Sequence, residues 1–208
     1  MASIRTFTLP HYHAYPVHVA LFKDVTNAAY LRTQLLEANP DFDYAFLDAS
    51  MILSPQHLLS ATFLALHSFL TSRQKTRTPH SELVFRLSPN NNIGESYKKF
   101  GLTDSTSSLI AVKLSITAEG AVAESVSRES VSRHLGHVVQ GTSVEIGEAG
   151  DELGAWCDLD KLRKMYKLSG DAGKKVKRGV IVNGAAPARD ERKEMESVVL
   201  GIIALKGS

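Results

Sequence analysis

The sequence predicts a single α/β domain over residues 1–208, in which a mixed sheet of about four to five strands is covered by helices. The C-terminal third is expected to be mostly helical. Short β-branched runs alternate with helical segments over the first two thirds of the chain, a pattern typical of helices packed on a sheet. The 208 residues are 43% apolar and 22% charged, a composition that supports one sizeable core.

The first elements follow from β-branched runs and capping residues. Residues 17–22 (VHVALF) predict a strand, and residues 44–47 (YAFL) predict a second, shorter one. Between them, apolar residues recur at helical spacing from a cap at Thr26 until Pro40 stops the helix. The order strand, helix, strand is therefore expected for this region.

The next segment predicts the central helix of the fold. Ser54 can cap it and Pro55 suits its first position, and the helix is expected to run to about Ser72. Its surface is apolar nearly all round, which indicates coverage on several sides. After a basic linker, residues 82–87 (ELVFRL) combine apolar residues with interleaved charge and predict a strand whose Arg86 points away from the core.

A short helix is then expected from an N-cap at Asn92 to a stop at Gly101, with Glu95 completing a capping box. On this helix Glu95 lies nearly in line with Lys99, so the sequence predicts that these two side chains pair and leave Lys98 freer. A strand, a helix and a brief strand should follow at residues 109–114, 130–139 and 143–146.

The last third contains a short basic helix over residues 158–169 and a terminal helix with one apolar stripe. The stripe consists of Met195, Val198, Val199, Ile202 and Ile203. It can be core or an interface, and burial against this domain is favoured. Segments rich in Gly, Ala, Ser and charge predict flexible insertions at residues 118–128, 147–156 and 170–187.

No motif predicts a catalytic residue, a metal site or a cofactor. The Gly-Lys pair at residues 173–174 lacks the spacing of a phosphate-binding loop. His134 and His137 share a helical face but have no third ligand nearby. Cys157, the single cysteine, has no basic neighbour to activate it and excludes an internal disulfide.

Positive charge is the remaining signal, because the net charge of +2 and pI near 8.6 allow contact with phosphates. The basic clusters are Arg73, Lys75 and Arg77, then Arg86, then Lys98 and Lys99, and finally Lys161, Arg163, Lys164 and Lys167. Each can be a phosphate contact or simply a solvated face. The free N–H groups that follow Asn92 are a further phosphate candidate.

The N-terminal residues show neither a signal peptide nor a membrane anchor, and the single cysteine fits a reducing compartment. We therefore expect a protein of the nucleus and cytoplasm that makes no membrane contact.

A succession of segments resembles a known family. The segments are SPQHLLSATFLAL, SELVFRLSPNNNIGESYKKFGL, SSLIAVKL, HLGHVVQGTSVEI and LDKLRKMYKL. Together they resemble the kinase-binding small subunit of the KEOPS/EKC complex, the TPRKB-like family, in a fungal-type form with insertions. The resemblance covers roughly residues 17–168 and the terminal helix.

The resemblance implies a compact α/β subunit without catalysis of its own. In the complex, a neighbouring subunit installs threonylcarbamoyl on the adenosine beside the tRNA anticodon. The family's subunit binds the atypical small kinase, and through it the transferase, and it captures the CCA end of tRNA. Members of the complex are also implicated in telomere maintenance and transcription. A protein-binding adaptor without tRNA contact is the alternative.

These implications yield two sets of candidate residues. The tRNA-binding candidates are Arg73, Lys75, Arg77, Arg86, Asn92, Lys98 and Lys99. The kinase-interface candidates are Met195, Val198, Val199 and Ile202.

Overall fold

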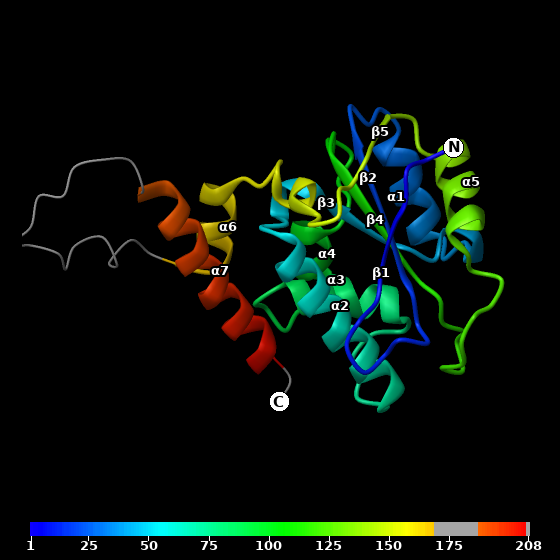
Figure 1. Cartoon of the computed structure of the whole chain (residues 1–208), viewed down its shortest axis with the longest axis horizontal. Coiled ribbons are helices and arrows are strands. Elements are labelled where there is room, and N and C mark those ends of the chain that lie inside the picture. Colours follow the sequence, from blue (N-terminus) through cyan, green and yellow to red (C-terminus); the bar gives the residue numbers. More distant parts are fainter. Residues whose placement is uncertain (169–186, 207–208) are drawn as a thin grey trace, which may run out of the picture.

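The computed structural model describes residues 1–168 and 187–206 and shows a single sheet of five strands (Figure 1). The strands are β1 (Arg5–Phe7), β2 (Val17–Lys23), β3 (Ala45–Asp48), β4 (Leu109–Leu114) and β5 (Thr142–Val144). Their order is β1-β2-β4-β3, and β5 also pairs with β2. The α/β class, the number of strands and the helical C-terminal region are confirmed.

The sheet is antiparallel at every described pair of neighbours, so the prediction of a mixed sheet is wrong. Val112 of β4 lies opposite both Val19 of β2 and Ala45 of β3. Strands β2 and β3 therefore run in the same direction but never pair, because β4 lies between them. The strand-helix-strand order is correctly predicted, but the sequence does not show that a later strand separates the first two.

The helices cover both faces of the sheet. They are α1 (Ala28–Leu36), α2 (Pro55–Leu70), α3 (Pro79–Leu87), α4 (Ile93–Phe100), α5 (Arg128–Val138), α6 (Leu159–Met165) and α7 (Pro187–Leu205), with short 3₁₀ turns η1 (Pro40–Phe42), η2 (Ala49–Met51) and η3 (Asp151–Gly154). Figure 1 shows α1 and α5 on one side of the sheet and α2 to α4 on the other, with α6 and α7 farther out.

Strand β2 shows how the two cores share the sheet. Its residues Val19 and Leu21 belong to the core beneath α2 and α3, whereas Ala20 and Phe22 belong to the core beneath α1 and α5. All four side chains are buried because successive residues of a strand point to opposite faces. This explains why β2 is buried from Val17 to Phe22 and is apolar there except at His18.

The predicted N-caps of α2 and α4 are confirmed. The Ser54 side chain accepts from the N–H of His57 and starts α2, with Pro55 at the first position. Asn92 starts α4 in the same way. Leu58 and Leu66 of α2 are fully buried, which confirms α2 as the central helix.

Residues 82–87 form part of helix α3, so the strand predicted there is wrong. Thr78 caps α3 and Pro79 occupies its first turn. The two charges that seemed to alternate with apolar residues lie four residues apart, which places Glu82 and Arg86 on one side of a helix, where they pair. Because this pair is itself buried, α3 lies inside the molecule on all sides.

The expected insertions differ in their placement. Residues 118–128 form turns beside an isolated bridge between Ile116 and Val122. Residues 147–156 include η3, whose Leu153 is buried in the main core. The third insertion, residues 170–187, lies outside the described residues except for the start of α7. None of the helices in the described ranges has the length and apolar character needed to cross a bilayer.

Candidate functional site

A polar cleft of about 620 Å³, which we name the lysine cleft, opens beside the end of α4. It is lined by Lys98 and Lys99 from α4, Lys161 from α6, and Trp156. The loop before β4 adds five hydroxyl residues, Thr103, Ser105, Thr106, Ser107 and Ser108. Ammonium, hydroxyl and aromatic groups in one groove are the groups that bind a single-stranded nucleic acid.

Helix capping holds these lysines in place. Asn92 Oδ1 accepts the N–H of Glu95 at 3.0 Å, and the opposite face of α4 is anchored by the buried Phe100. Asp158 Oδ1 accepts the N–H of Lys161 at 2.9 Å and starts α6, whose Leu162 is buried. The basic clusters of α4 and α6 thus meet in one cleft, although they are far apart in the sequence.

The charge of the lysine cleft is mixed, because three lysines face the carboxylates of Asp48 and Asp158. Lys161 Nζ lies 3.4 Å from Oδ2 of Asp48 and 3.2 Å from Oγ of Ser50. A phosphate bound here must compete with Asp48 for Lys161. The lining residues alone carry one positive charge in excess, but the carboxylate of Glu95 beside Lys98 offsets it, so the cleft favours an anionic ligand only modestly.

The predicted pairing on α4 is wrong. Glu95 Oε1 lies 2.8 Å from Nζ of Lys98, and this hydrogen bond raises the pKa of Lys98. Lys99 is exposed and forms no ion pair with any residue that the structure describes. Positions three and four residues apart both lie beside Glu95 on a helix, so the spacing alone does not choose between them. Lys99 is therefore the more available cation.

The basic linker before α3 is fixed by a buried carboxylate. Oε2 of Glu82 accepts the backbone N–H groups of Lys75 and Thr76 at 2.9 and 3.0 Å. This arrangement leaves the side chains of Arg73, Lys75 and Arg77 exposed. Of these three, only Arg77 lines one of the two clefts.

Arg86 is buried, which corrects its prediction as an exposed cation. Its Nε lies 2.9 Å from Oε1 of Glu82, and one terminal nitrogen donates to Oγ of Ser68 at 2.8 Å. The other donates to the backbone oxygen of Lys206. With its donors used inside the molecule and 4% of its surface exposed, Arg86 has no path to a phosphate.

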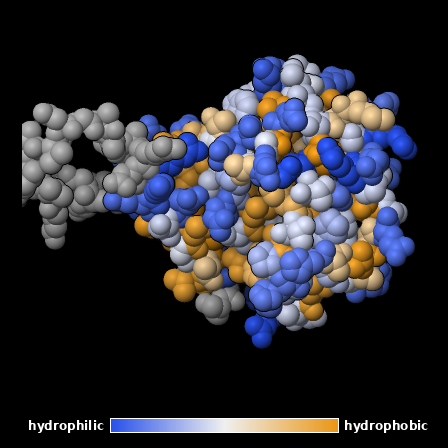
Figure 2. Space-filling view, in the orientation of Figure 1, coloured by the Kyte–Doolittle hydropathy of each residue, from blue (hydrophilic) through white to orange (hydrophobic). Residues whose placement is uncertain are grey.

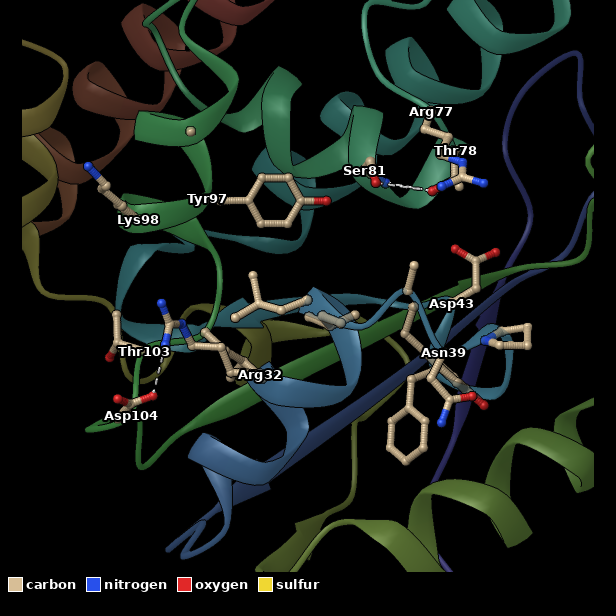
Figure 3. A pocket seen from close by; sticks show the side chains of 18 of the residues that line it. Arg32, Asn39, Asp43, Arg77, Thr78, Ser81, Tyr97, Lys98, Thr103 and Asp104 are labelled. Carbon is tan, nitrogen blue, oxygen red and sulfur yellow. Dashed lines mark hydrogen bonds and ion pairs between the residues drawn. The ribbon is translucent and has the colours of Figure 1, made fainter.

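A second cleft, of about 980 Å³, lies between α1 and α4, and we name it the Tyr97 cleft (Figure 3). In Figure 3, Tyr97 points its hydroxyl along the cleft toward the end where Asp43 and Arg77 lie, and Lys98 stands at the other end. Apolar walls come from Leu35, Leu36, Phe42, Tyr44 and Leu102. Lys98 and Thr103 line both clefts, so the two are neighbours.

Asp43 carries the carboxylate of the Tyr97 cleft. Its Oδ2 lies 3.0 Å from Nδ1 of His80 and 3.8 Å from Nζ of Lys113. Burial alone would raise the pKa of Asp43, but the hydrogen-bonding contact with His80 and the charge of Lys113 outweigh it and lower this pKa to about 2. Asp43 is therefore ionised at neutral pH.

Helix α7 divides the predicted kinase-interface residues into two groups. Met195 and Val199 are buried in the main core and belong to this domain's own packing. Val198 is 47% exposed, Ile202 is half-buried, and Leu205 is 74% exposed. Figure 2 shows apolar side chains along the part of the molecule where α7 lies. Only the outer residues of α7 remain available to a partner.

Outside the two clefts, the surroundings of Cys157 and His134 are those of structural rather than catalytic side chains. Burial raises the pKa of Cys157 to about 11, so its thiol is a poor nucleophile at neutral pH. His134 stacks on Tyr44, and its Nδ1 lies 3.0 Å from that residue's hydroxyl. Within residues 1–168 and 187–206, no three His, Cys, Asp or Glu side chains form a group that could hold a metal.

Asp43, Tyr97 and Trp156 are among the cleft residues that were not singled out from the sequence. Tyr97 lies beside the predicted Lys98 on α4, so an aromatic residue next to a basic pair was a usable signal. Asp43 and Trp156 become cleft residues only through contacts with distant segments, which the sequence does not reveal.

Comparison with known proteins decides the family. The model of the family described as "Kinase binding protein CGI-121" matches residues 22–207. The chain belongs to the CGI-121 family. A protein of Phaeosphaeria nodorum named "EKC/KEOPS complex subunit CGI121" is 61% identical over 232 residues, covering 99% of this chain and 100% of the relative.

More distant CGI-121 proteins bear the same name. One from Aspergillus terreus is 42% identical over 207 residues and covers 100% of this chain and 98% of the relative. One from Schizosaccharomyces pombe is 33% identical over 160 residues and covers 77% and 86%. The family predicted from the quoted segments is therefore confirmed.

Proposed function

We propose that this chain is a non-catalytic subunit of the KEOPS/EKC complex that supports threonylcarbamoylation of the adenosine next to the tRNA anticodon. It does so by binding the complex's atypical kinase, and through it the transferase, and by binding the CCA end of tRNA. Membership of the CGI-121 family supports the assignment to the complex. We place the protein in the nucleus and cytoplasm, where tRNA is made and modified.

The observation that carries the tRNA contact is the lysine cleft. Lys98 and Lys99 from α4 and Lys161 from α6 gather beside Trp156 and a row of hydroxyl groups. A single strand needs cations for its phosphates and an aromatic face for a base, and this cleft offers both. Of the remaining candidates, Arg77 lies in the neighbouring cleft, Asn92 acts through the cap of α4, and Arg73 and Lys75 are exposed beside Arg77.

The kinase contact is supported by the outer side of α7. Val198, Ile202 and Leu205 recur at spacings of four and three along this helix and leave apolar surface uncovered. A helix face of this kind suits an apolar surface on a partner protein. An adaptor that binds the kinase without touching tRNA remains the alternative, and it requires only this second surface.

The test uses the purified chain with the kinase of its own complex and with tRNA. The kinase is expected to co-purify with the chain. Filter-binding assays should show that the chain binds tRNA, and that its affinity for tRNA falls when the salt concentration rises and when the CCA end is removed. Kinase binding with no tRNA affinity would leave the adaptor function. Failure to bind the kinase would contradict the assignment to the complex. The repurified chain alone should show no ATPase or transferase turnover.

A further inference from the structure

The basic linker joins α2 to α3 over residues 71–78 and places three cations around one threonine. Arg73, Lys75 and Arg77 are exposed, and Thr76 lies half-buried among them. Arg73 precedes Thr76 by three residues. Many serine/threonine kinases bind an arginine at this position through acidic side chains of their substrate groove, so the charge pattern of the substrate selects the kinase. The linker therefore has the sequence of a phosphorylation site for an arginine-directed kinase.

The other threonine near this arginine, Thr78, is committed to helix α3. Its Oγ1 accepts the N–H of Ser81 at 3.1 Å and forms the N-cap, with Pro79 next in the chain (Figure 3). Because this cap lies within the first turn of α3, residues 72–77 can move away from the domain while α3 keeps its start. Thr76 is thus the threonine that local movement of the linker makes accessible.

A single carboxylate oxygen holds the linker closed. Oε2 of Glu82 accepts the N–H of Lys75 at 2.9 Å, and it accepts both the N–H and the hydroxyl of Thr76 at 3.0 Å. The other oxygen of the same carboxylate, Oε1, pairs with Arg86. Opening of the linker therefore breaks the bonds to Oε2 but leaves the buried ion pair in place.

The closed linker carries two local costs. Ser72 has a φ of 56°, in the left-handed region that a residue with a side chain rarely adopts. Oε1 of Gln74 is buried without a hydrogen-bond partner among the described residues. Opening relieves both, so the linker belongs to the part of the fold that unfolds locally at low cost. In the open form the hydroxyl of Thr76 is free to enter the active site of a kinase.

Phosphorylation would turn this contact from attraction into repulsion. Oγ1 of Thr76 forms a bond to the γ-phosphorus of ATP while the bond from that phosphorus to the β,γ-bridging oxygen breaks. The hydroxyl proton passes to the catalytic carboxylate of the kinase, and ADP leaves. The product carries a charge of about −1.5 to −2 at the place where the hydroxyl donated to Glu82. A hydrogen-bond donor is thus replaced by a charge of the same sign as the carboxylate.

We propose that Thr76 is the phosphorylation site of an arginine-directed serine/threonine kinase, and that the phosphate holds the basic linker away from Glu82. The phosphate also offsets much of the positive charge of Arg73, Lys75 and Arg77, so the modified linker attracts an anionic partner less strongly. Neither tRNA nor the complex's own kinase is needed for this modification, so it stands independently of the proposed function.

The first experiment incubates the full chain with Mg-ATP and the catalytic domain of a calmodulin-dependent protein kinase, a class that selects arginine three residues before the acceptor. Mass spectrometry of proteolytic fragments should locate the phosphate at Thr76. Arg73→Ala should slow its incorporation at least about tenfold, whereas Lys75→Ala, which removes another exposed cation of the linker, should slow it no more than about twofold. Absence of phosphate at Thr76, or equal effects of the two substitutions, would overturn the proposal.

Hydrogen exchange measures the release of the linker. In the phosphorylated chain, the amides of Lys75 and Thr76 should exchange at least about tenfold faster than in the unmodified chain, since they lose a charged acceptor. Amides of β4 serve as the internal reference and should not change. Thr76→Val removes the hydroxyl without adding charge, so its linker amides should stay protected. Unchanged exchange after phosphorylation, or equally fast exchange in Thr76→Val, would overturn release by the phosphate.

Discussion

Glu82 and Arg86 form an ion pair buried one turn apart in α3, with Nε of Arg86 2.9 Å from Oε1 of Glu82. The pair connects two parts of the surface. Glu82 holds the backbone of the basic linker, and Arg86 donates to the backbone oxygen of Lys206 at the end of α7. The linker that carries Arg77 and the helix proposed to meet the kinase are thus fixed by the same two side chains.

Loss of one partner of this pair should destabilise the whole domain. Arg86→Met leaves the Glu82 carboxylate buried without its cation and should cost about 3–5 kcal/mol in the free energy of unfolding by urea. The matched control, Arg32→Met, breaks the exposed pair with Asp104 and should cost about 1 kcal/mol or less. Equal costs for the two variants would show that the buried pair is not a structural anchor.

Adjacent valines of α7 should separate partner binding from stability. Val198→Asp changes a side chain that is 47% exposed, so the melting temperature should hold while kinase binding is abolished. Val199→Asp buries an unpaired charge in the core and should prevent stable folding. The measurements are thermal melting and co-purification with the kinase. Unchanged kinase binding by Val198→Asp would place the interface elsewhere.

His57 should make the fold sensitive to mild acid. Its Nδ1 accepts the N–H of Leu53, so Nε2 carries the proton and faces the hydroxyl of Tyr166, which donates to the backbone oxygen of Leu87. Burial lowers the pKa of His57 from 6.5 to about 3. The unfolded chain therefore binds a proton that the folded chain does not, and stability falls as the pH drops below 6.5.

By pH 5 this effect should remove about 2 kcal/mol from the free energy of unfolding, measured by urea titration at a series of pH values. Most carboxylates keep their charge in this window, so the slope reports mainly on histidine. The variant His57→Gln should lose the part of the slope that amounts to about 2 kcal/mol by pH 5, while His18, His80 and His134, whose pKa values burial also lowers, account for slope that remains. A slope as steep in the variant as in the wild type would contradict a contribution from His57.

The two lysines of α4 should contribute unequally to tRNA binding. Lys98 is already paired with Glu95, whereas Lys99 has no ion pair among the described residues. Lys99→Ala should therefore weaken tRNA binding more than Lys98→Ala in filter-binding titrations at one fixed salt concentration. A stronger effect at Lys98 would show that RNA displaces Glu95 and that the pairing pattern of the free protein does not govern RNA binding.

The order of elements was predictable because caps and apolar periods are local properties. Ser54 and Asn92 start helices as predicted, and residues 17–22 and 109–114 form strands. Strand β1 was not predicted, since three residues carry too little pattern to distinguish a strand from an extended loop.

Residues 82–87 were mispredicted for a physical reason. A helix that is buried on all sides has apolar residues at nearly every position, so its sequence lacks the 3.6-residue hydrophobic period of an amphipathic helix. When two charged residues of a buried ion pair interrupt such a segment, its sequence resembles the alternating polar and apolar residues of a half-exposed strand. The same error placed Arg86 at the surface. The sequence did not indicate that Asp43 and Trp156 line clefts, because their places there depend on contacts between distant segments.

The most direct test of the proposed function is the salt dependence of tRNA binding by a lysine-cleft variant. In Lys99→Ala with Lys161→Ala, the slope of log affinity against log salt should fall by roughly 0.7 for each phosphate that the protein no longer neutralises. The control replaces Lys23 and Lys193, which are also exposed but line neither cleft. A shallower slope in the cleft variant alone is the predicted result, and identical slopes in both variants and the wild type would contradict tRNA binding at this cleft.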